Sequence, residues 1–316
     1  MIERAAGSLR PFQCAFGLLH SRDGVAWEHA STSPVLTPAE LGYPHGSLQD
    51  PRLVKIDGLY YLVGVLRPYC WDCLPTGVGL PEYREVNYPD RNFEEPNVSR
   101  SFIATSGDLR SWKVLGYCSD ITCDDRDNIL FPEKINGRFV LLRRPLDRIN
   151  NGGGGPGIWL SYSDDAVHWE QPRFVAGPER DWEGEKIGGA TPPVRTPAGW
   201  LALYHGVDAG AVYRVGALLL DAGDPSVVLA RTGGPIFEPQ EYYERTGLVI
   251  PNVVFPSGNV IVGDELWIYY GVCDSAIALA TVKLEDLLRS LHSLRSTPGA
   301  GQIVRACQPA TVRILS

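Results

Sequence analysis

The chain has 316 residues, 44% hydrophobic and 21% charged, which is the composition of a soluble protein with a sizeable core. Its formal net charge of −8 argues against a nucleic-acid partner, because a phosphate backbone requires a basic protein face. No apolar stretch is long enough to span a bilayer and no basic, apolar leader opens the chain, so we expect a cytoplasmic protein with no membrane partner.

A repeated pattern runs through the predicted elements in chain order. An apolar run leads to a Ser or Asp and then to an acidic turn, and the aligned positions are Ser21, Ser106, Ser163, Asp221 and, less completely, Thr281. The last three steps between these positions are 57, 58 and 60 residues, whereas the first is 85. Residues 69–98 account for the longer first step, because they contain Pro, Gly and charge without periodicity, and we expect them to form a long inserted loop.

After each marker the chain passes through a Pro-containing loop into a hairpin centred on Asp-Gly, Asn-Gly, Ala-Gly or Gly-Asp. About four strands per repeat, in roughly five repeats, are typical of a β-propeller. We therefore expect an all-β fold, a five-bladed β-propeller spanning residues 1–316 as one domain. A short C-terminal helix is expected at 283–294, with a tail over 289–316. A β-sandwich with chance similarities is the alternative.

Polar residues at equivalent places in the repeats should converge on one pocket, because the loops of one propeller face meet near the axis. Cations beside isolated carboxylates suit a polyhydroxylated, anionic or phosphorylated ligand, since Arg binds phosphate oxygens in pairs. For any single Arg, a solvated strand end is the simpler explanation. The converging residues are expected to be Asp50, Arg52, Lys134, Arg143, Arg144, Lys186, His205, Tyr242, Tyr243, Glu244, Arg245, Asn252 and Asp274.

Five stretches in this order resemble glycoside hydrolase family 130, over about residues 16 to 288. They read DPRLVKIDGLYYL, DNILFPEKINGRFVLLRRP, WEGEKIGGATPPVRTPAGWLALYHGV, YRVGALLLD, and YYERTGLVIPNVVFPSG followed by LWIYYGVCD. That family comprises mannoside phosphorylases and related mannosidases on a five-bladed β-propeller. The resemblance implies an inverting phosphorylase that cleaves a β-mannoside with inorganic phosphate to give α-mannose 1-phosphate. Its partners would be phosphate and a mannose-containing oligosaccharide, with no cofactor and no metal.

The resemblance also implies individual roles. Asp50 would be the single catalytic acid, relaying its proton through the 3-hydroxyl of the sugar while phosphate attacks the opposite face. An inverting hydrolase would instead need a second carboxylate to activate water. The phosphate-binding set is expected to be Arg144, Lys186, His205 and Tyr213, with the neighbouring Arg143. The substrate-binding set is expected to be Asp274, Arg52, Asn252, Tyr243 and Glu244. For Arg52, orienting Asp50 and forming a sheet-edge salt bridge are both open.

Departures from the family pattern leave alternatives open. Gln49 precedes Asp50 where the family has Glu, and early family strands that contact sugar have no clear match before Phe16. The first blade could be completed by the C-terminal residues 310–316, by a partner subunit in a homo-oligomer, or not at all. Glu185 lies beside Lys186, so an inverting mannosidase with Glu185 or Glu244 as base is an alternative. A sugar-binding propeller without catalysis is another.

Cysteine spacing offers one further reading. Cys70 and Cys73, with Cys118 and Cys123 downstream, have a spacing compatible with a four-thiolate zinc site. Seven cysteines is an odd number without a disulfide framework, and free thiols in a reduced protein are the simpler explanation.

Overall fold

The computed structural model describes residues 13–74, 82–86, 88, 91–120, 122–146, 156–247, 250–293 and 313–315. Over these residues the fold is all-β with two short α-helices, α1 (Tyr242–Arg245) and α2 (Leu284–Arg289). Two single-turn 3-10 helices cover Pro38–Leu41 and Asp181–Glu183. Neither α-helix in this described part is long and apolar enough to cross a membrane.

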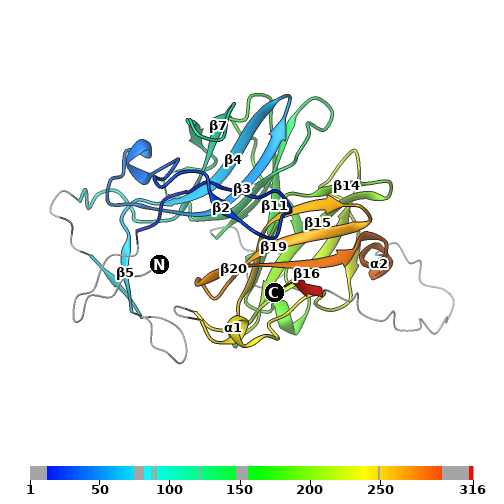
Figure 1. Cartoon of the computed structure of the whole chain (residues 1–316). Coiled ribbons are helices and arrows are strands. Elements are labelled where there is room, and N and C mark those ends of the chain that lie inside the picture. Colours follow the sequence, from blue (N-terminus) through cyan, green and yellow to red (C-terminus); the bar gives the residue numbers. More distant parts are fainter. Residues whose placement is uncertain are drawn as a thin grey trace.

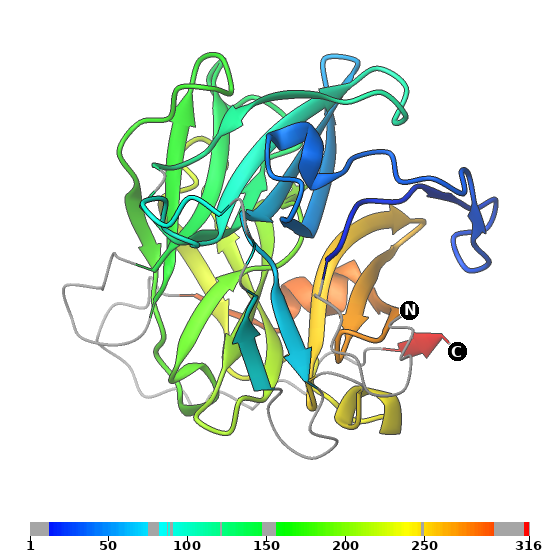
Figure 2. The same cartoon turned by 90° about the vertical axis from the view of Figure 1, so that its left-hand side faces the viewer.

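Consecutive strands pair antiparallel in four successive meanders (Figures 1 and 2). The first contains β3 (Ser47–Ile56), β4 (Leu59–Arg67), β7 (Arg100–Ser106) and β8 (Lys113–Tyr117). The second contains β9 (Asp125–Leu130), β10 (Phe139–Pro145), β11 (Ile158–Ser163) and β12 (Arg173–Ala176). One parallel residue pair, Arg100 with Asp125, joins these two meanders into an eight-stranded sheet.

The other two meanders come from the second half of the chain. The third contains β13 (Lys186–Gly189), β14 (Val194–Thr196), β15 (Gly199–Val207), β16 (Tyr213–Leu220), β17 (Val228–Thr232) and β21 (Leu291–Ser293). The fourth contains β18 (Val254–Val262), β19 (Glu265–Val272), β20 (Ala276–Lys283) and β22 (Arg313–Leu315). Two small hairpins lie outside the meanders: β1 (Leu19–His20) with β2 (Glu28–His29), and β5 (Trp71–Leu74) with β6 (Glu82–Glu85).

Local sequence explains the hairpins and the repeat. Asp57-Gly58 joins β3 to β4 with φ of 50° and 86°, a pair of left-handed residues that suits a two-residue hairpin. At Ser21, Ser106 and Ser163 the hydroxyl accepts the backbone N–H three residues on and donates to an Asp two residues on. The Asp221 carboxylate accepts the N–H groups of the next turn in the same way. The predicted repeat is thus confirmed at these four markers, whereas Thr281 lies within β20.

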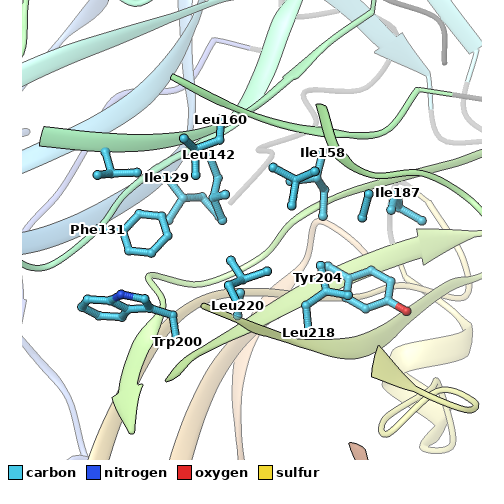
Figure 3. Packing of buried hydrophobic residues seen from close by; sticks show 14 of the residues in the cluster. Ile129, Phe131, Leu142, Ile158, Leu160, Ile187, Trp200, Tyr204, Leu218 and Leu220 are labelled. Atoms are coloured by element: carbon cyan, nitrogen blue, oxygen red, sulfur yellow. The ribbon is translucent and has the colours of Figure 1, made fainter. Parts of the chain in front are cut away.

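The meanders pack face to face, and this places the core. Every residue of β15 is buried, because both faces of this strand are covered. Trp200 and Tyr204 face the second meander, where Trp200 packs edge-on against Phe131 with ring centroids 5.1 Å apart (Figure 3). Leu201 and Leu203, the alternate residues, face the fourth meander. Burial of both faces explains why β15, apart from His205, lacks the alternating polar residues of a one-sided strand.

The N-terminal segment 16–36 connects the first and fourth meanders. The Phe16 ring stacks on Phe102 of β7, with centroids 6.4 Å apart. At the other side the Tyr269 hydroxyl of β19 donates to the Gly24 carbonyl at 2.9 Å, and Trp27 packs edge-on against Tyr269. The segment contains only the two-residue strands β1 and β2, so it is shorter than the four-stranded blade expected from the repeat.

Three expectations about chain segments need correction. The inserted loop at 69–98 contains the β5–β6 hairpin and is therefore not wholly irregular. The C-terminal helix is shorter than 283–294, because α2 ends at Arg289 and residues 291–293 form β21 beside β17. Strand β22 pairs with β20 of the fourth meander, so residues 313–315 extend the last sheet and not the first blade, while 310–312 and 316 lie outside the described residues.

Candidate functional site

Four polar residues with left-handed backbones lie in or beside strands β3, β9, β18 and β19. Asp50, Asp127, Asn252 and Asp274 all have left-handed backbones, with φ of 53°, 53°, 59° and 51°. Asp50 lies at a register shift in β3, and Asp127 lies opposite a register shift in β10. Non-glycine residues in this conformation cost free energy and concentrate at functional sites, and bulges there re-aim side chains. Three carboxylates and an amide with this geometry point to a candidate active site.

Arg52 fixes the bulge that carries Asp50. The guanidinium is buried, and its Nη1 donates to the Asp50 carbonyl at 2.7 Å while Nε donates to the Ala190 carbonyl at 3.0 Å. It also lies over the Phe255 ring, 5.1 Å from the centroid. Its Nη2 has no hydrogen-bond partner among the described residues. Arg52 therefore ties the first meander to the third and fourth, and this arrangement fits the orienting role better than a sheet-edge salt bridge.

Two of these three carboxyl groups, Asp50 and Asp274, retain protons more readily than free acids. Burial raises the pKa of Asp50, and the nearby Asp127 carboxylate adds to the rise, although Arg52 opposes it. For Asp274, loss of water around the group and the charge of Asp50 raise the pKa to about 6. Solvent still reaches the Asp274 side chain, so its shift reflects partial enclosure. A carboxyl with a raised pKa is suited to donate a proton near neutral pH.

Asp127, Arg144 and His205 form a second group, the Asp127 cluster. Arg144 donates from Nε to Asp127 Oδ2, and Nε2 of His205 lies 3.6 Å from the same oxygen. Although burial opposes it, the Arg144 guanidinium holds the pKa of Asp127 well below its usual range. Burial lowers the pKa of His205 to about 3. The imidazole is therefore neutral at pH 7.

Lys186 and Tyr213 border this cluster. Lys186 Nζ lies 5.4 Å from the centroid of the Tyr213 ring, and that ring stacks on His205 with centroids 5.8 Å apart. Gly188 is the strand partner of His205, and a Cβ at Gly188 would lie 2.6 Å from His205 Cε1 and 3.0 Å from Arg144 Nε. Only glycine leaves room for this packing. Arg144, Lys186, His205 and Tyr213 thus lie together, as the sequence predicts.

Other predicted residues have partners elsewhere. Arg143 points to the opposite face of β10 from Arg144, where it donates to the buried Asp125 and to Ser161. Lys134 pairs with Asp57 at 3.1 Å, between two hairpin turns. The structure does not bring these two cations to the Asp127 cluster through any contact among the described residues.

In the loop that carries α1, Glu244 stabilises the local structure. Glu244 is fully buried, and its Oε2 accepts the N–H groups of Gln240 and Glu241 at 2.7 and 2.8 Å. Its Oε1 accepts the Tyr270 hydroxyl at 2.7 Å. Both oxygens are engaged, so Glu244 is poorly placed to activate water. Tyr243, by contrast, is 38% exposed on α1.

Asn252 and the other loop residues are placed as follows. The Asn252 carbonyl accepts the N–H of Tyr213 at 3.0 Å, which links the start of the fourth meander to the cluster. Tyr242 is 79% exposed, and Arg245 donates to the Pro239 carbonyl. Glu185 is exposed beside Lys186.

Two charged residues of the site were missed from the sequence. Asp127 and Arg126 lie at the start of β9. The charge of Asp127 raises the pKa of Asp50, and the charge of Arg126 lowers it. Arg126 pairs with Asp124 at 3.0 Å and is the strand partner of Arg144. A sequence signal for these residues exists, because they precede the strand sequence NILF in the same way that Asp50 precedes its hairpin. The run CDDRD nevertheless resembles a charged surface loop, which obscures that signal.

No metal site emerges from the described side chains, which contain no group of three or more His, Cys, Asp or Glu residues arranged to hold an ion. Cys70, Cys118 and Cys123 form no disulfide among the described residues. The Cys73 side chain lies outside the described residues.

Comparison with known proteins identifies the family. Residues 94–293 match the family model for beta-1,4-mannooligosaccharide phosphorylase. The 1,2-beta-oligomannan phosphorylase of Thermoanaerobacter sp. (strain X514) is 36% identical over 272 residues, which cover 86% of this chain and 79% of that protein. The chain belongs to glycoside hydrolase family 130.

Further members of glycoside hydrolase family 130 agree. The beta-1,2-mannobiose phosphorylase of the same organism is 37% identical over 277 residues, covering 87% of this chain and 79% of that protein. The solved structure of beta-1,2-mannobiose phosphorylase from Listeria innocua, in complex with beta-1,2-mannobiose, superposes with a TM-score of 0.68 at 28% identity. It covers 86% of this chain and 67% of that chain. The resemblance seen in the sequence is confirmed, and the chain is an enzyme of the glycoside phosphorylase type.

Proposed function

We propose that this protein is an inverting phosphorylase that cleaves a β-mannoside with inorganic phosphate and releases α-mannose 1-phosphate. The observation that carries the proposal is the proximity of one enclosed acid, Asp50, to the cations Arg52, Arg126 and Arg144, all of which act on its charge. A phosphate nucleophile requires cations of this kind to bind it.

The proposed reaction uses each group once. Asp50 gives its proton, through the 3-hydroxyl of the mannose, to the glycosidic oxygen. The bond between that oxygen and the anomeric carbon breaks, and a phosphate oxygen bonds to the carbon from the opposite face. Arg144 and Lys186 supply positive charge to the phosphate, and Nδ1 of the neutral His205, which has no hydrogen-bond partner among the described residues, accepts a hydrogen bond from a protonated phosphate oxygen. Asp274 holds sugar hydroxyls, the role that family membership suggests for it.

We propose a β-1,2 linkage, because two relatives that match most of this chain are named for β-1,2-linked mannosides. Hydrolysis has less support, since both Glu244 oxygens are engaged and Glu185 is exposed beside a cation.

We also propose that the four meanders are blades of a five-bladed propeller, with segment 16–36 in place of the fifth blade. Its contacts with both Phe102 and Tyr269 support this arrangement.

The test is turnover of β-1,2- and β-1,4-mannobiose with and without inorganic phosphate, with mannose 1-phosphate measured directly. We expect phosphate-dependent release of mannose 1-phosphate, faster from the β-1,2 isomer. Asp50→Asn should lower kcat on the order of 10²–10⁴-fold, the usual contribution of a general acid. Lys186→Ala should raise the KM for phosphate more than the KM for mannobiose. Free mannose produced equally well without phosphate would overturn the proposal.

A further inference from the structure

Asp127 is an unexpected residue for a site that binds an anion. It is buried and ionised within contact of Arg144, so its negative charge opposes a nearby phosphate. Its backbone is left-handed, with φ of 53°, a conformation that aspartate adopts at a cost. Asp127 therefore weakens anion binding directly and also costs backbone free energy. We expect it to have another role that compensates for both.

The contacts of Asp127 supply that role. One oxygen, Oδ2, accepts from Arg144 Nε and faces His205 Nε2 at 3.6 Å. The carboxylate thus fixes the plane of the guanidinium and favours the imidazole tautomer with its hydrogen on Nε2. The His205 ring also packs against Tyr213 and Phe255, with centroids 5.8 and 4.9 Å away.

We propose that Asp127 is a positioning residue for phosphate, which holds Arg144 and His205 in one orientation and acts on the anion only through them. This inference rests on the proposed function, because it assumes that phosphate binds at the Asp127 cluster. The carboxylate lowers the net positive charge of the cluster, which weakens phosphate binding. Because it also orders the side chains of Arg144 and His205 before phosphate binds, less conformational entropy is lost on binding.

The same strand offers a matched control. Asp125 lies two residues before Asp127, is equally buried, and accepts from Arg143 as Asp127 accepts from Arg144. Asp125→Asn therefore removes a buried carboxylate from an Arg pair of the same kind, and among the described residues its side chain makes no hydrogen bond to Arg144 or His205. A purely structural effect of losing such a pair should appear in both variants.

The experiment measures phosphate binding by calorimetry and phosphorolysis kinetics for Asp127→Asn, Asp127→Glu and Asp125→Asn, with thermal unfolding as the check on folding. We expect Asp127→Asn to raise the Kd and KM for phosphate by about tenfold or more, with a smaller change in the KM for mannobiose. Asp127→Glu keeps the charge but displaces it, and should also weaken phosphate binding. Asp125→Asn should leave both constants within about twofold.

A double-mutant cycle with Arg144→Ala tests whether Asp127 acts through Arg144. Adding Asp127→Asn to Arg144→Ala should raise the phosphate Kd far less than it does in the wild-type background. Fully additive effects, or equal effects of Asp127→Asn and Asp125→Asn, would overturn the inference. If wild-type protein binds phosphate without phosphorolysis, the proposed function fails and the binding data still decide the inference. If it binds no phosphate, both fail.

Discussion

Replacing Gly188 by alanine places a methyl group inside the Asp127 cluster. The added Cβ would lie 2.6 Å from His205 Cε1 and 3.0 Å from Arg144 Nε, and closer still to Asp127. Ordinary contact begins at 3.4 Å, so His205 must move by about 0.8 Å. The ring cannot yield easily, because Tyr213 and Phe255 pack against it. The methyl therefore displaces the groups that we expect to bind phosphate.

The size of the effect follows from these distances. A displacement of about 1 Å at reacting groups can cost on the order of 10²-fold in rate. Inserting a methyl group into a packed interior costs about 1–3 kcal/mol of stability, which lowers Tm by a few degrees in a chain of this size. We expect the kcat/KM for phosphate to fall roughly 10–100-fold, a larger loss than the stability change alone produces in a protein that remains folded.

The assay is initial-rate phosphorolysis of mannobiose at varied phosphate, below the Tm of every variant. Gly116→Ala in β8 is the control, since its nearest neighbour would be Val167 Cγ1 at 3.8 Å, an ordinary contact. It should retain wild-type kinetics. A Gly188→Ala enzyme with unchanged kcat/KM for phosphate would show that the Asp127 cluster does not bind the nucleophile.

Three further outcomes are expected. Because the folded pKa of Asp274 is about 6 and an unfolded Asp titrates near pH ~3.9, the native state binds more protons between these values and loses stability as pH rises through them. Asp274→Asn should flatten that fall in Tm, and an unchanged pH slope would contradict the shift. Glu244→Gln should lower stability by about 1–3 kcal/mol through its bonds to Gln240, Glu241 and Tyr270, with little change in kinetics; a raised mannobiose KM at wild-type Tm would instead indicate substrate contact. Phosphate at about 100 times its Kd should stabilise the wild type by about 2.7 kcal/mol, and equal stabilisation of Lys186→Ala would count against Lys186 as a ligand.

The sequence predicts which hairpins contribute to the site, because turn residues and repeat spacing are local signals. Asp50 precedes one predicted hairpin and Arg144 ends another, and in the fold the charge of Arg144 lowers the pKa of Asp50. Arg143 shows the limit of this reasoning. Adjacent residues of a strand face opposite sides, and one residue of register decides which arginine joins the cluster.

Tertiary environment accounts for the other differences. The neutral state of His205 results from burial between three meanders, which no local pattern reveals. Glu244 resembled a loop carboxylate, yet Tyr270 and the turn before α1 use both of its oxygens. The N-terminal segment contacts Tyr269, 245 residues away from Gly24 along the chain, a pairing that the repeat could not specify because the segment lacks the full repeat.

The most direct test of the central claim is a crystal structure with phosphate and mannose bound. We predict phosphate oxygens within hydrogen-bonding distance of Arg144 and Lys186, with the anomeric carbon of the mannose between the phosphate and Asp50. Phosphate bound away from the Asp127 cluster, or bound on the same face of the sugar as Asp50, would contradict the account.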